Sequence, residues 1–123
     1  MLQHTVSELT LSNGASGLLI DIPGSSLMEV RVSFRAGDVY CADPSKWETA
    51  HTMEHLMLGA NGRFTAAQEF KAEIEKNGAY INAATQHVGM TYEATCPDFE
   101  WHDFLRLFID SLNDPRFLKD EFT

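Results

Sequence analysis

Residues 45–59, SKWETAHTMEHLMLG, carry signals for both ends of a helix. Ser45 and Glu48 have the spacing of a capping box, in which the serine side chain accepts from a backbone amide and the glutamate side chain reaches back. Gly59 suits the left-handed position that often ends a helix. We therefore expect a helix over about residues 46–58.

Three side chains of this helix, in the segment His51-Thr52-Met53-Glu54-His55, form a pattern with known chemistry. Residues three and four apart share one helix face, so His51, Glu54 and His55 project together. Two imidazoles at this spacing can bind one zinc ion, and the carboxylate can take a proton from a water that zinc activates for amide hydrolysis. A surface helix that carries His and Glu by accident is the alternative that the motif alone leaves open.

The residues before this helix predict three strands. Apolar residues recur over about residues 6–11 and 18–20, and over 28–34 they alternate with polar ones, which is the period of a half-buried strand. Asn13-Gly14 and Pro23-Gly24 supply turn residues between them. We expect these strands to be sequential neighbours in an antiparallel sheet.

The residues after the helix predict two more helices around a hairpin. Thr65 to Gln68 fits a second capping box, and Asn77-Gly78 ends the helix that it opens. Residues 79–85 and 90–96 form the hairpin, and Pro97-Asp98 opens a third helix. Its expected apolar stripe is Trp101, Leu105, Phe108 and Leu112. The order β-β-β-α-α-β-β-α predicts one α+β domain, with helices packed on one face of a mostly antiparallel sheet.

Composition limits the possible partners. The 123 residues include 44% hydrophobic and 22% charged residues, which is typical of a single globular domain. The formal net charge of -9 disfavours nucleic acid and anionic membranes as partners. No apolar run reaches the roughly 20 residues of a membrane span, and no secretion signal begins the sequence, so we expect a cytoplasmic protein. Cys41 and Cys96 are expected to be thiols rather than a disulfide.

From about Val6 to Phe122 the sequence resembles the pitrilysin/insulysin family of zinc peptidases, whose inverted motif is His-x-x-Glu-His. The similar segments follow one another in the family's order: the strand 30–37, the helix 51–58, the start of the next helix at Glu69-Phe70, the turn and strand 77–85, the return strand at Thr91-Tyr92, and the loop 114–117.

The resemblance implies roles for five residues. His51 and His55 are zinc ligands, and Glu54 is the general base. Asn82 and Ala83 lie on the strand to whose edge a substrate peptide adds as an extra strand, where backbone groups can hold any extended peptide. The alternative for Asn82 is a polar strand residue that caps the turn near Gly78. The substrate would be a peptide or a small unfolded protein.

The resemblance also implies parts that lie outside the sequence. A hydrolytic zinc site has three protein ligands, and the family's third, a glutamate, would fall about nine residues past Thr123. Neither Asp120 nor Glu121 matches a ligand position. We therefore interpret residues 1–123 as one truncated, amino-terminal catalytic domain, inactive in isolation, whose missing partner is a carboxy-terminal half or a second copy in a homodimer.

Two other functions stay open. The chain could be a protease-dead subunit of this family, although the intact His51, Glu54 and His55 argue against that. It could also be a small binding module whose exposed sheet edge recruits partners, with the motif accidental. The zinc stoichiometry of the complete protein would separate a peptidase from both alternatives.

Overall fold

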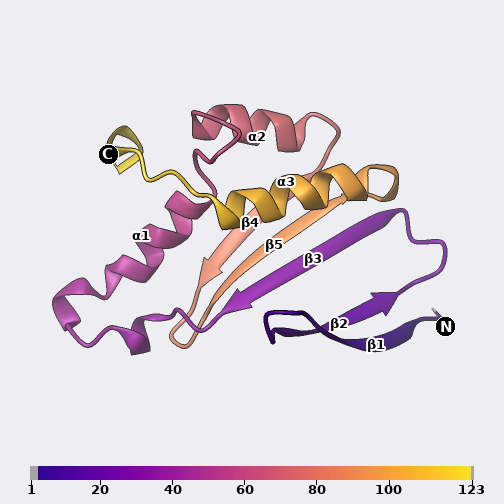
Figure 1. The fold of residues 1–123 in the computed structure, drawn as a ribbon, viewed down its shortest axis with the longest axis horizontal. Helices are drawn as coiled ribbons and strands as arrows, with labels where there is room; N and C mark the ends of the chain where they lie inside the picture. Colours follow the sequence, from indigo (N-terminus) through magenta and orange to yellow (C-terminus); the bar gives the residue numbers. More distant parts are fainter. Residues whose placement is uncertain (1–2, 123) are drawn as a thin grey trace.

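The computed structural model describes residues 3–122, and Figure 1 shows their arrangement. The elements follow the predicted order, with short 3₁₀ turns between some of them. The strands are β1 (Thr5–Thr10), β2 (Ser16–Asp21), β3 (Leu27–Phe34), β4 (Tyr80–Thr85) and β5 (Met90–Pro97). The helices are α1 (Glu48–Met57), α2 (Ala67–Glu75) and α3 (Trp101–Asn113). The α+β prediction is confirmed.

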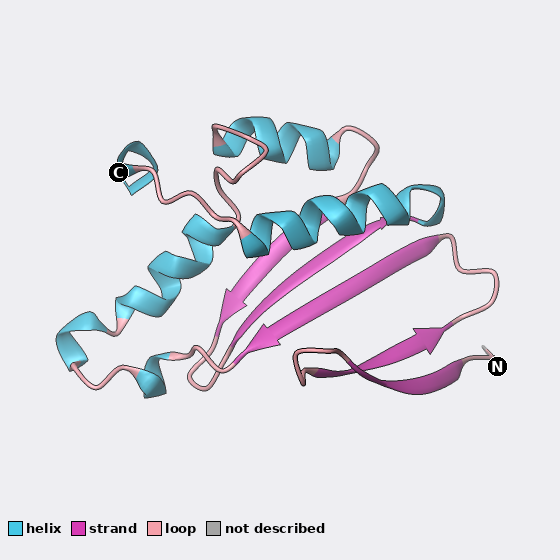
Figure 2. Ribbon diagram, viewed as in Figure 1, coloured by secondary structure: helices cyan, strands magenta, loops and turns pink. Residues whose placement is uncertain are grey.

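The main sheet has three antiparallel strands in the order β3-β5-β4, so β5 is central (Figure 2). Every second residue of β5 is buried, which is the period of a strand with one face on the core. The opposite face of the sheet is polar, because Arg31 of β3 pairs there with Glu29 and with Glu93 of β5. This alternation decides which side chains of each strand can reach the helices.

The first two strands form a separate hairpin, in which Thr5 pairs with Asp21 and Thr10 with Ser16. The expectation that β2 and β3 are neighbours in one sheet was wrong. β3 pairs along all eight of its residues with β5, whose length matches its own. Every residue of β1 and β2 is exposed, and the hairpin lies apart from the helices in Figure 1.

The core lies between the main sheet and the helices α2 and α3, which Figure 1 shows on the same side of it. Phe70 of α2 and Phe108 of α3 are fully buried against the inward residues of β5. The buried stripe of α3 is Phe104, Phe108 and Ser111, whereas Trp101 is 47% exposed. The predicted stripe was therefore correct at Phe108 and at the half-buried Leu112, which packs against the core, but wrong at Trp101.

The start of α1 differs from the predicted capping box. The Asp43 carboxylate accepts hydrogen bonds from the Ser45 amide at 3.0 Å and the Ser45 hydroxyl at 2.7 Å. The Ser45 side chain thus bonds to Asp43, two residues before it, instead of accepting from a helix amide. A 3₁₀ turn over Pro44–Lys46 precedes the helix. Hydrogen bonding to Ser45 lowers the pKa of Asp43. Asp43 thus caps the 3₁₀ turn, and α1 begins after Trp47 with no side-chain cap of its own.

Gly59 ends α1 without the left-handed conformation that we expected. Its amide donates to the Leu56 carbonyl at 3.1 Å, which closes a tight last turn. A Cβ at Gly59 would lie 2.7 Å from Glu121 Oε2, so a side chain there would displace the Glu121 carboxylate. Glu121 also accepts from the Ala67 amide at 3.0 Å, so this carboxylate caps α2 in place of the predicted Thr65 box.

Within residues 3–122, no helix combines the length and apolar character that a membrane span requires.

Candidate functional site

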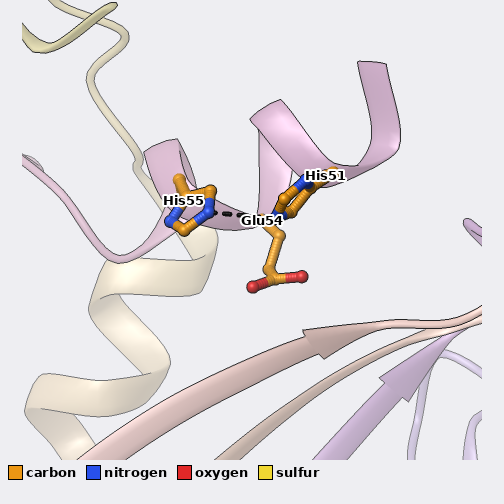
Figure 3. Close-up of side chains that lie close together, drawn as sticks. All are labelled: His51, Glu54 and His55. Atoms are coloured by element: carbon orange, nitrogen blue, oxygen red, sulfur yellow. Dashed lines mark hydrogen bonds between the residues drawn. The ribbon is translucent and has the colours of Figure 1, made fainter. Parts of the chain in front are cut away.

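The three motif residues converge on one side of α1, as Figure 3 shows. His51 Nε2 and His55 Nε2 lie 3.1 Å apart, and the two rings are tilted by 47° with centroids 4.8 Å apart. One ligand atom from each of His51, Glu54 and His55 falls within 4.8 Å of the others. No second group of three metal-binding side chains converges in this way in the described part of the chain.

The histidine pair fits the donor set of a zinc ion. Two nitrogens bound at the usual zinc–nitrogen length and at a tetrahedral angle would lie about 3.3 Å apart, close to the separation of the two Nε2 atoms. The far nitrogen of His51, Nδ1, lies 3.4 Å from Glu48 Oε2. A carboxylate on that nitrogen favours the tautomer with Nε2 free to bind a metal. Both imidazoles are exposed, so an ion could reach them from solvent.

Glu54 differs from the histidines because it is buried, with 8% of its surface exposed. Its Oε2 accepts a hydrogen bond from the Thr85 hydroxyl on β4. Figure 3 shows the carboxylate extending from α1 toward the strands, away from the helix backbone. Its carboxylate thus lies between the histidine pair and the sheet, where it can act on a group held beside α1.

Tyr92 of β5 lies in the sheet face beneath Glu54. Its side chain is 1% exposed and its hydroxyl donates to Met90 Sδ at 2.7 Å. Burial, and to a lesser extent the Glu54 carboxylate, raises the pKa of Tyr92 to about 12. The tyrosine is therefore neutral near pH 7 and does not repel the Glu54 carboxylate.

The predicted substrate residues lie on β4, which is paired on one side by β5 and is an edge of the main sheet in the described residues. The Asn82 side chain lies on the polar sheet face and donates to Glu93 Oε1 at 3.3 Å. It does not cap the turn near Gly78. Ala83 is half-buried on the opposite face. Since α1 packs against β4, this edge runs beside the motif residues.

The remaining histidines and the cysteines lie outside this cluster. His87 pairs with Asp38 at 2.5 Å, and His102 lies 3.7 Å from Asp103. Both cysteines are free thiols, as expected. Burial, and to a smaller extent the charge of Glu100, raises the pKa of Cys96.

Sequence reasoning missed two polar neighbours of the motif. Glu48 stands three residues before His51 on the same helix, so its helical spacing could have indicated the contact. Thr85 lies 31 residues from Glu54 on another element. No local pattern connects those two residues, and only the packing of α1 on β4 brings them together.

The fold of this chain is similar to part of the fold of a known protease. The crystal structure of a protease from Helicobacter pylori matches with a TM-score of 0.83 and 23% sequence identity. The match covers 97% of this chain and 28% of the protease, so the chain spans little more than a quarter of that protein's length. This likeness shows the fold alone. No curated protein matches the chain.

The sequence itself matches the family model described as insulinase, peptidase family M16, over residues 18–123. The matched region includes the α1 motif and every element from β3 onward. The resemblance noted from the sequence is thereby confirmed. Since the match covers most of its length, the chain belongs to the insulinase family of peptidases, family M16.

Proposed function

We propose that this chain supplies the zinc-binding helix and the general base of a metalloendopeptidase. The observation that carries the proposal is the convergence of His51 Nε2 and His55 Nε2, 3.1 Å apart, with the Glu54 carboxylate on the same face of α1. Membership of a peptidase family supports it.

His51 and His55 would hold the zinc ion, which when bound supplies a Lewis acid that lowers the pKa of water and polarises an amide carbonyl. Glu54 would take a proton from the attacking water and pass one to the leaving amine. Its second oxygen, Oε1, has no protein partner among residues 3–122 and is the atom available for this transfer. The histidines and the glutamate thus have separate tasks.

The edge of β4, at Asn82 and Ala83, would hold the substrate peptide as an added strand. An edge offers backbone donors and acceptors to any extended peptide, and alternate side chains provide selectivity. The packing of α1 on β4 supports this assignment, because a peptide on that edge would pass beside Glu54. Peptides or small unfolded proteins are therefore the substrate class that we propose.

The third zinc ligand would come from outside these residues, because Glu121 is bound to the amides of Ala60 and Ala67 and is not part of the cluster. We expect the 123-residue chain alone to bind zinc weakly and to cleave peptides poorly. Sub-micromolar zinc affinity of the isolated monomer, measured by calorimetry, would contradict this expectation.

Substitutions in the complete protein test the proposal. Glu54→Gln should abolish peptide hydrolysis and keep zinc, because the amide has the same shape but cannot accept the proton. His51→Ala and His55→Ala should lose the metal as well. His102→Ala is the matched control, since His102 is exposed and lies outside the cluster. Wild-type turnover by Glu54→Gln would exclude Glu54 as the base.

Zinc stoichiometry also separates the alternatives. A protease-dead subunit or an edge-strand binding module has no need of a metal at His51 and His55. A complete protein that binds less than one zinc ion per site would therefore favour those functions.

The exposed apolar hairpin of β1 and β2 supports association with a second copy or with a further part of the protein.

A further inference from the structure

Thr85 is the last residue of β4 and the only hydrogen-bonding partner that the described residues give Glu54. Alternation along the strand turns Ile81, Ala83 and Thr85 toward the helices, and these three are half-buried while their neighbours are exposed. The Thr85 hydroxyl thus enters a mostly apolar layer between β4 and α1, where it meets the buried carboxylate.

Other groups near the carboxylate do not replace this contact. The hydroxyl of Tyr92 donates to Met90 Sδ rather than to Glu54. Among residues 3–122, no lysine or arginine forms an ion pair with Glu54. The last torsion of a glutamate side chain is broad, so a carboxylate without a fixed partner rotates over a wide range. A single hydrogen bond to Oε2 is enough to restrict that rotation.

We propose that Thr85 is a positioning residue for the reaction: its hydroxyl holds Oε2 of Glu54, so that the carboxylate keeps one orientation close to the histidine pair. This inference rests on the proposed function, because it assigns Thr85 a task that matters only when Glu54 transfers protons. Thr85 would act through Glu54, and it is not among the residues that would hold the zinc ion. Its effect is on the orientation of the base, not on metal binding.

The expected effect is on turnover. A hydrogen bond to a charged group, together with the alignment that it provides, corresponds to roughly a ten- to hundredfold change in rate. Since the substrate edge at Asn82 and Ala83 is left intact, KM should change little. Since the imidazoles of His51 and His55 do not contact Thr85, the amount of zinc bound should not change either.

Three variants of the complete, zinc-loaded protein test this. Thr85→Val removes the hydroxyl at almost constant shape and should lower kcat ten- to a hundredfold at constant KM and zinc content. Thr85→Ser restores the hydroxyl and should recover most of the rate. Thr91→Val is the matched control, because Thr91 loses a similar hydrogen bond, 2.9 Å to Ser33 Oγ, on the opposite face of the same sheet.

A second measurement does not depend on activity. In the metal-free 123-residue chain, the carboxylate carbon resonance of Glu54, assigned with Glu54→Gln, should shift in Thr85→Val and stay in place in Thr91→Val. Should Thr85→Val not fold, Thr85→Ala provides the same comparison.

The outcomes separate the two proposals. Wild-type kcat in a folded Thr85→Val protein, or an unmoved Glu54 resonance, would overturn the role of Thr85 while leaving the peptidase proposal intact. A complete wild-type protein that binds no zinc and cleaves no peptide would refute the proposed function itself.

Discussion

Tyr92 offers a quantitative test of the buried layer beneath Glu54. Burial raises the pKa of its phenol from 10.0 to about 12, with a smaller contribution from the Glu54 carboxylate. The folded chain therefore keeps this proton at a pH where the unfolded chain has lost it. The contribution of this pKa difference to the stability of the folded chain is fully present below pH 10 and is lost progressively as the pH rises toward about 12.

The magnitude follows from the two pKa values. Between pH 9 and pH 11, the free energy of unfolding of the wild type should fall by about 1.3 kcal/mol relative to Tyr92→Phe, which has no phenol to titrate. Urea unfolding at intervals across this range measures the difference directly, and the value at pH 8 gives the baseline effect of losing the hydroxyl. Tyr80→Phe is the matched control, because the Tyr80 side chain is 57% exposed.

A constant difference between wild type and Tyr92→Phe from pH 9 to pH 11 would refute the reasoning. It would mean that the phenol is equally accessible to water in the folded and unfolded chains. The packing of α1 and α3 over β5 would then be looser than the 1% exposure of Tyr92 indicates.

Three further predictions concern stability and association. Phe108→Ala should lower the free energy of unfolding by about 3–5 kcal/mol, because the ring is fully buried; a loss below about 1 kcal/mol in urea would contradict this. Glu121→Gln should cost about 1 kcal/mol by weakening the cap at Ala67, and an unchanged melting temperature would count against that cap. The chain should self-associate through the exposed apolar β2 face that includes Leu18 and Ile20, so light scattering should give a mass above the 13.8 kDa of the monomer. Replacing both with Lys should restore the monomer even though it reduces the net negative charge, and an unchanged mass would move the contact elsewhere.

Much of this fold could be predicted because its strongest signals are local. Period-two alternation located β3, the predicted hairpin located β4 and β5, and Gly78, with φ of 85°, ends the α2 segment as its sequence indicated. The spacing within the motif placed His51, Glu54 and His55 together, since a helix fixes such neighbours without help from the rest of the chain.

The remaining features depend on contacts between distant segments. Turn residues at Pro23-Gly24 do not determine which strand β3 joins, and β5, more than 50 residues later, is its partner. Glu121 occupies the cap of α2 from 54 residues away, which no capping pattern near Thr65 could reveal. The contact from Thr85 to Glu54 is of the same kind, because it exists only where a helix and a strand pack together.

Because side chains alternate between the two faces of β4, insertions of an odd number of residues should affect this site differently from insertions of an even number. Asn82 lies on the polar face and Thr85 on the helix face, three residues apart along one strand. One residue inserted between Asn82 and Thr85, with Thr85 held in place, would turn Asn82 away from Glu93. Two inserted residues would keep both side chains on their present faces and lengthen the edge by roughly 7 Å. Natural or engineered length variants of this segment should therefore differ by even numbers.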